Sequence, residues 1–377
     1  MKMKFSLLKN LFVVILFLSI GKTFGQFEKE FFAVDSSAPA PQYIKYGLKF
    51  NSLAFFKNNE YFHPLVEGYT LPGFQLQPRV YFQAGDKFSV EAGVHLAQYS
   101  GKKGLNSIEP LFRATYNPTP AFSILLGWIK GTQYHQLIEP LYQWEKVYTH
   151  PLEYGVQFLV NKDKFTLDTW IDWERYIELN DPFQEELTFG TNSCIRLLQS
   201  DNFAVGIPLQ ITVKHQGGQI TAGGDPLKTL ANWATGFKSS FQTNQSFLSK
   251  VNFDFYYVGF SDLSPQKRLI FKNGFGIYPI MSAEMKDFNL TAGYWYGYQF
   301  IASKGEPLFL SASATNPSAI YPNRQVVTFK SSFRKQIYRT ISFSAYAEAY
   351  YDAKISQIDY AYGINMAVSG DIFIKKQ

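Results

Sequence analysis

Residues 73–99 read GFQLQPRVYFQAGDKFSVEAGVHLAQY. From position 74 to position 83 the even positions are apolar and the odd positions are polar or amphipathic, and the alternation returns from Phe88 to Leu96. The four residues 84–87 (Ala-Gly-Asp-Lys) separate the two runs. Because successive side chains of a strand point to opposite faces, this stretch predicts a hairpin with one apolar face and one hydrated face.

The same pattern recurs along the chain and predicts sixteen strands between residues 42 and 377, with fourteen or eighteen as the alternatives. The twelfth is expected at 268–279 and the thirteenth at 286–299. Seven short turns alternate with eight longer loops, which is typical of outer-membrane barrels with short periplasmic turns and long extracellular loops. A soluble β-sandwich would need one core for all these strands. We therefore predict an all-β fold, a single transmembrane antiparallel β-barrel.

The first residues predict export. Lys2 and Lys4 precede an apolar run from Leu11 to Ile20, and small residues lead up to Gly25. That run is too short to span a bilayer, so residues 1–25 are expected to be a cleaved signal peptide. Residues 26–41 are expected to be a short periplasmic extension, and residues 42–377 the barrel in the cell outer membrane.

Composition agrees with this class of protein. Aromatic residues make up 18% of the chain, with 25 Tyr and 36 Phe, a density that suits interfacial girdles. Without the four lysines of residues 1–25 the formal charge of +6 falls to about +2, so no nucleic-acid partner is expected. The one cysteine, Cys194, excludes an internal disulfide. Pro78 and Pro208 fall inside predicted strands and are expected to mark bulges or strand ends near the rim.

On these repeated amphipathic strands, residues 42–377 resemble the bacterial outer-membrane β-barrel superfamily and, in strand number, its porins. The Tyr-, Phe-, Asn- and Lys-rich composition is similar to that of outer-membrane proteins of Bacteroidota, a Gram-negative group. In porins the loop after the fifth strand folds into the pore. The resemblance implies the same place for residues 131–151, with a constriction formed by Tyr134, His135, Glu139, Tyr142, Trp144 and Glu145.

Alternation also predicts which charged residues face the lumen. The expected acidic residues are Glu153, Asp168, Asp172 and Glu174. The expected basic residues are Lys45, Lys49, Arg79, Arg113, Arg196, Lys214, Lys330 and Arg334. A closed sheet would place the sixth and seventh strands opposite the fourteenth to sixteenth, so the two sets predict a transverse electric field.

These features predict a porin-like channel for passive or substrate-selective passage of small hydrophilic solutes. One alternative is a docking barrel whose loops bind a partner protein or surface ligand. Another is a channel for hydrophobic substrates, entered past apolar loop residues such as Phe62 and Phe309. Expected partners are outer-membrane lipids and either further copies in a trimer or a second outer-membrane protein.

We find no pattern that indicates catalysis. His135, Glu139, Glu145 and His150 could ligate a metal, but their spacing matches no helical zinc motif. The glycines of residues 215–228 follow no phosphate-loop spacing, and no local serine–histidine signature appears. The sequence therefore predicts a protein without enzymatic activity, cofactor or metal.

Overall fold

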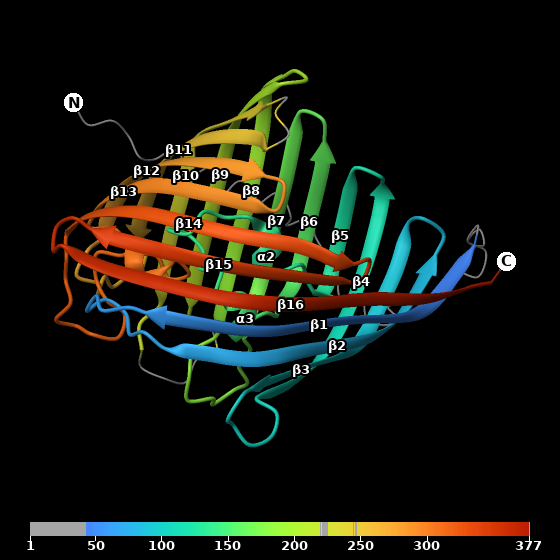
Figure 1. The fold of residues 1–377 in the computed structure, drawn as a ribbon. Helices are drawn as coiled ribbons and strands as arrows, with labels where there is room; N and C mark the ends of the chain where they lie inside the picture. The colour runs from blue at the N-terminus through green and yellow to red at the C-terminus, as the bar shows by residue number, and fades with distance from the viewer. Residues whose placement is uncertain (1–42, 219, 221–224, 244, 246, 377) are drawn as a thin grey trace. The chain divides into compact units, whose positions relative to one another are not determined.

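The computed structural model describes residues 43–376, apart from 219, 221–224, 244 and 246, so the predicted signal peptide and extension lie outside the described residues. These residues form a closed barrel of sixteen antiparallel strands (Figure 1). The strands are β1 (Ile44–Glu60), β2 (Thr70–Ala84), β3 (Phe88–Tyr99), β4 (Ser107–Thr119), β5 (Phe122–Trp128), β6 (Tyr154–Lys162), β7 (Phe165–Arg175), β8 (Glu186–Gln199), β9 (Phe203–Gln216), β10 (Lys228–Gln242), β11 (Leu248–Asp262), β12 (Asn273–Met285), β13 (Phe288–Tyr298), β14 (Asn323–Tyr338), β15 (Ile341–Asp352) and β16 (Gln357–Lys376). Each strand pairs with its neighbours in sequence, and β1 pairs with β16 to close the ring. The predicted fold class and strand number are confirmed.

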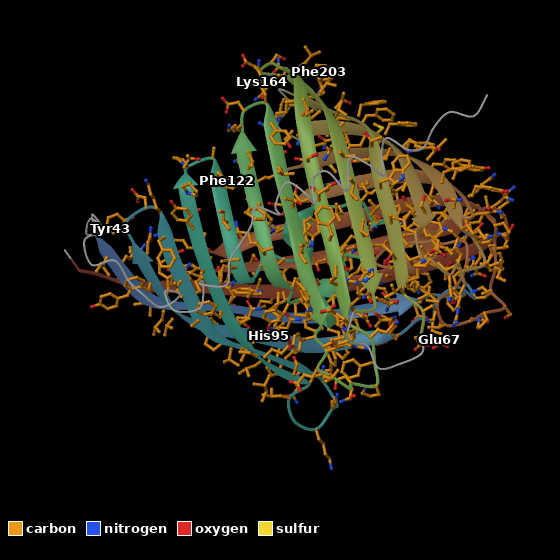
Figure 2. The ribbon with its side chains drawn as sticks, turned by 180° about the vertical axis from the view of Figure 1, so that it is seen from behind. Tyr43, Glu67, His95, Phe122, Lys164 and Phe203 are labelled. Carbon is orange, nitrogen blue, oxygen red and sulfur yellow. The ribbon has the colours of Figure 1, made fainter. Side chains whose placement is uncertain are left out.

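The outer face of the barrel is apolar, as the alternation predicts. On β1, Leu48 and Phe50 are exposed on the outside, whereas Lys49 between them reaches a carboxylate of β3 across the inner face. Figure 2 shows side chains projecting from the strands of the barrel wall. Closure leaves no free sheet edge, as a lipid-facing sheet requires. Among the described residues, no helix has the length and apolar character needed to cross a membrane.

The structure corrects two details of the strand prediction. The twelfth strand runs from 273 to 285, so both its ends lie about five residues later than expected. Pro78 and Pro208 lie in the middle of β2 and β9, and the register is the same on either side of each proline. The predicted bulges or strand ends are therefore wrong at both sites. Each proline is paired with a residue of one neighbouring strand but not of the other, because proline has no N–H to donate.

The apolar exterior leads to a first prediction. We expect the protein to stay in the membrane pellet after washing with carbonate or urea, because releasing it would expose this face to water. Unboiled samples should migrate differently from boiled samples on denaturing gels, since the closed barrel resists detergent. Release by carbonate, with no change of mobility on boiling, would contradict a lipid-embedded barrel.

Candidate functional site

The segment between β5 and β6 folds into the lumen and touches the wall on opposite sides. It contains two one-turn helices, α2 (Thr132–His135) and α3 (Lys146–Thr149). On one side Gln210 of β9 accepts a hydrogen bond from the backbone N–H of Ile138. On the other, Gln75 of β2 donates to the carbonyls of Val147 and Tyr148. The segment therefore crosses the barrel.

A second segment, between β13 and β14, packs against the first. The backbone N–H of Gln143 donates to the carbonyl of Lys304, and that of Glu306 donates to the carbonyl of Glu139. A 3-10 helix, η2 (Pro307–Phe309), buries Phe309 against Trp295 and Tyr278 of the wall. We call residues 131–151 and 299–322 together the plug. Its buried apolar side chains continue those of the wall in one cluster.

His135 fixes the first segment to β6 and β7. Its Nδ1 lies 2.7 Å from Asp168, its Nε2 lies 2.9 Å from Glu153, and its side chain is fully buried. The ring stacks on Trp170 with 3.4 Å between centroids, and a Cβ on Gly190 would lie 2.1 Å from that indole. Burial alone would lower the pKa of His135, but hydrogen bonds to the two carboxylates raise it to about 9. Both ring nitrogens face a carboxylate, which favours the imidazolium form and leaves neither nitrogen free to take a proton from a substrate.

Two further ion pairs hold the plug on its other side. Glu145 pairs with Lys57 of β1 and accepts a hydrogen bond from Asn59. Glu139 pairs with Lys330 of β14. His135, Glu139 and Glu145 thus take different partners, and His150 lines the luminal cavity. Among the described residues these four do not form the metal-ligand set considered from the sequence.

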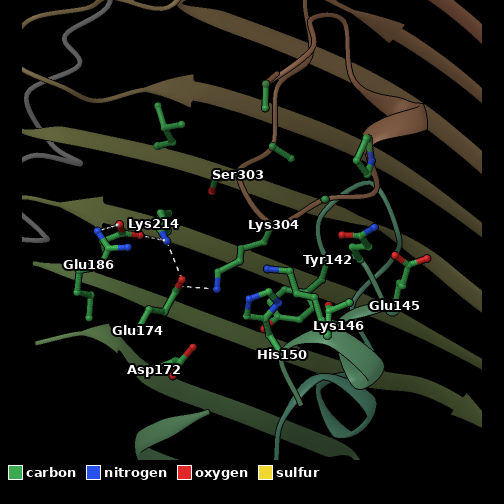
Figure 3. Close-up of a pocket in the computed structure, with 18 of the residues that line it drawn as sticks. Tyr142, Glu145, Lys146, His150, Asp172, Glu174, Glu186, Lys214, Ser303 and Lys304 are labelled. Carbon is green, nitrogen blue, oxygen red and sulfur yellow. Dashed lines mark hydrogen bonds and ion pairs between the residues drawn. The ribbon is translucent and has the colours of Figure 1, made fainter. Parts of the chain in front are cut away.

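The plug and the long loops enclose a cavity of about 1170 Å³ at the long-loop end of the barrel (Figure 3). Lys146, His150 and Lys304 reach it from the plug. Lys214 of β9 and Glu174 of β7 reach it from the wall. Glu174 lies 2.5 Å from Lys304 and 2.6 Å from Lys214, which also lies 2.5 Å from Glu186. Plug and wall are thus joined by charge at the cavity as well.

The lumen charges predicted from the sequence are on the inner face, but nearby residues neutralise many of them. Glu153 and Asp168 bind His135, and Glu174 binds Lys214 and Lys304. Lys49 of β1 and Arg79 of β2 both pair with Glu91 of β3. The guanidinium of Arg113 lies 3.8 Å from the ring centroid of Trp128. Sequence reasoning missed the neutralising partners because they lie on the plug or on adjacent strands.

A different pair of polar residues lies on the outer face at the long-loop rim. The Nδ1 of His215, on β9, is 2.8 Å from the Oγ1 of Thr229, which stands directly opposite on β10. Lys214 and Gln216 both line the luminal cavity, so alternation turns His215 outward. The backbone N–H of Thr229 donates to the Oγ of Ser264, which fixes Thr229 against the next loop.

Apolar side chains of three neighbouring loops are exposed around this rim. They are Tyr176, Leu179 and Phe183 after β7, Leu227 before β10, and Leu263 after β11. Hydrogen bonds connect these loops. The side-chain amide of Gln184 donates to the carbonyls of Asp225 and Pro226, and the backbone N–H of Gly217 donates to the carbonyl of Glu185. Exposed apolar groups in such a patch are costly in water and favourable in a lipid interface.

Comparison with known proteins gives one family match and a common fold. A family described as Lipid A 3'-O-deacylase-type matches residues 41–377. No curated protein matches the chain. A loop L8 deletion mutant of OmpT, an outer membrane protein of Vibrio cholerae, is 10% identical with a TM-score of 0.51, over 86% of this chain and 99% of that one. OprD of Pseudomonas aeruginosa is 10% identical with a TM-score of 0.50, over 90% and 99%. At this identity both show the outer-membrane barrel fold alone.

The family match corrects the prediction of a protein without enzymatic activity. That prediction is wrong, because the matching family is described by an acyl-removing activity and the match spans the entire barrel. The sequence contains no local pattern that indicates this activity. His215 and Thr229 are fourteen residues apart and meet only when β9 pairs with β10.

Proposed function

Since the chain belongs to the Lipid A 3'-O-deacylase-type family, we propose that it hydrolyses an acyl ester of an outer-leaflet lipid, with Thr229 as nucleophile and His215 as general base. The observation that carries the proposal is the 2.8 Å hydrogen bond between the two side chains on the outer face of the rim. A hydroxyl within hydrogen-bond reach of an imidazole is the arrangement that activates a weak nucleophile.

The place of the pair suits a membrane-bound ester. The ester groups of a lipid lie at the boundary between head groups and acyl chains, the depth at which a barrel rim and its interfacial aromatic residues meet the membrane. The exposed loop residues Tyr176, Leu179 and Leu263 would enter the same boundary. A substrate could then reach Thr229 from the leaflet without entering the lumen.

The proposed chemistry is an acyl transfer in two steps. The Thr229 oxygen attacks the ester carbonyl carbon while the Nδ1 of His215 takes the hydroxyl proton, so the reactive tautomer carries no proton on Nδ1. The ester C–O bond breaks and the leaving alcohol takes that proton from His215. Water then attacks the threonyl ester while the same imidazole takes its proton, and His215 returns that proton to the Thr229 oxygen as the fatty acid leaves.

Deacylation of vesicles tests this proposal. With purified protein and vesicles containing lipid A, mass spectrometry should detect a free fatty acid and the matching loss from the lipid. Thr229→Ala and His215→Asn should each lower the rate by about a thousandfold, because each removes one half of the activated pair. Thr235→Ala is the matched control, since its hydroxyl lies on the same strand and donates to the carbonyl of Pro208.

The outcomes separate the activity from the site. Vesicles left intact by the wild-type protein would refute the hydrolase. Release that persists in Thr229→Ala at the wild-type rate would refute this nucleophile. If Thr235→Ala lowered the deacylation rate as much as Thr229→Ala, the effect would come from a general disturbance of the β9–β10 rim. That result would contradict the assignment.

The luminal cavity favours a second candidate function, the selective passage of small hydrophilic solutes. Its walls combine charged and apolar side chains, and the inner face of the barrel carries many buried polar side chains, such as Gln157, Thr212 and Asn232. The plug would limit this passage, because both of its segments are hydrogen-bonded into the lumen.

A further inference from the structure

Lys146 lines the luminal cavity without a carboxylate partner among the described residues. It begins α3, is half-buried, and forms no ion pair with any described residue. Its Nζ lies 5.4 Å from the ring centroid of Tyr142. Burial lowers the pKa of Lys146 to about 7, and the nearby positive charge of Lys304 acts in the same direction. An ammonium group held in this way gains from any anion that reaches it.

The neighbouring cations have only part of their charge compensated. Lys304 lies 6.0 Å from the same Tyr142 ring centroid and shares Glu174 with Lys214. Glu186 pairs with Lys214 and also with Arg175, so two carboxylates serve three cations, Lys304, Lys214 and Arg175. His150 also lines the cavity, and Figure 3 shows Lys146, Lys304 and His150 converging around Tyr142.

From this arrangement we propose that Lys146, Lys304 and His150 bind the oxyanion group, phosphate or carboxylate, of a small organic solute. The solute's body would occupy the remaining cavity, whose walls include Tyr142, Leu230 and Ile301. The volume of about 1170 Å³ exceeds what a bare inorganic ion fills and lies slightly above the usual range of ligand pockets, about 300–1,000 Å³. The site is separate from the rim pair and does not depend on the proposed hydrolysis.

The acidic residues of the cavity define where the charged group would lie. Glu153 is already bound to His135, Glu145 to Lys57, and Glu174 and Glu186 to lysines. Glu109 of β4 also lines the cavity and forms no ion pair with any described residue. Asp172 also lines the cavity and accepts a hydrogen bond from the backbone N–H of Tyr154. An oxyanion would avoid Asp172 and lie on the side of Lys146 and Lys304.

Calorimetric titration of the full-length protein in detergent tests the site. The probes are phenyl phosphate, benzoate and inorganic phosphate. We expect phenyl phosphate or benzoate to bind, and Lys146→Met to weaken that binding by about tenfold or more, since it removes a charged hydrogen bond. Lys250→Met is the matched control, because Lys250 pairs with Glu284 on another part of the wall and does not line the cavity.

Each outcome bears on the proposal. Binding of phenyl phosphate alone, or of benzoate alone, would identify which oxyanion the site takes. Failure of both organic probes to bind, or equal weakening by Lys250→Met, would overturn it. If inorganic phosphate bound as tightly as phenyl phosphate, the cavity would not contact the organic part of the solute, and that part of the proposal would be refuted. His150→Asn, which changes an exposed side chain, should weaken binding severalfold and provides the test if Lys146→Met loses its heat-modifiable gel mobility.

Discussion

Replacing His135 by alanine should lower the free energy of unfolding by about 3–5 kcal/mol, because it leaves two buried carboxylates without their cation. Glu153 and Asp168 both bind this imidazolium, and Trp170 would lose its stacking partner. Denaturant unfolding in detergent, followed by tryptophan fluorescence and gel mobility, measures the change. His150→Ala is the matched control from the same loop, since His150 is exposed and its loss should change the free energy by less than about 0.5 kcal/mol.

The same anchor predicts how stability depends on pH. The pKa of His135 is raised to about 9 in the folded protein, against 6.5 for a free histidine. Its stabilising contribution should therefore be complete below about pH 6.5 and be lost as the pH rises through about 9. The stability difference between wild type and His135→Ala should shrink between these limits. A difference that stays constant from pH 6 to pH 10 would show that the imidazolium is not the source of stability.

The barrel itself could be predicted from the sequence because alternation is a local property. Residues such as Leu48 and Lys49 show their faces within a few positions, and closure follows from the need to pair every strand in a membrane. The end positions of β12 were less predictable. Its first expected residues lie in the loop after β11, where apolar residues such as Leu269 pack against the core shared by plug and wall and extend the apparent pattern.

The plug contacts could not be predicted in the same way. Lys57 and Glu145 are far apart in sequence and meet only because the β5–β6 segment crosses the lumen. The resemblance to porins predicted where that segment lies, but not which residues of the wall bind it. The rim pair had no signal either, since the pairing of His215 with Thr229 depends on the β9–β10 register. The positions of the charged residues on the inner face were predicted, whereas the residues that neutralise them were not.

Opening the plug should have the largest effect on the lumen. Replacing residues 137–144 by a short Gly-Ser linker would remove Leu141, which is fully buried in the core shared by plug and wall, and the Glu139–Lys330 ion pair. We expect single-channel conductance in planar bilayers to rise severalfold, because the first segment would no longer cross the barrel. The second segment would still occupy part of the lumen through Arg324, which donates to the carbonyls of Leu308 and Leu310.

Two comparisons make this result specific to the plug. A linker replacing residues 101–105 is the control, because this exposed loop between β3 and β4 should leave conductance unchanged. If the deletion does not fold, Glu139→Gln combined with Glu145→Gln removes the ion pairs to Lys330 and Lys57 without shortening the chain. Conductance that stays at the wild-type level while a trimer dissociates would show that the segment serves subunit contact. A rise in conductance with intact assembly would mean instead that residues 131–151 are the barrier that a solute in the luminal cavity must pass.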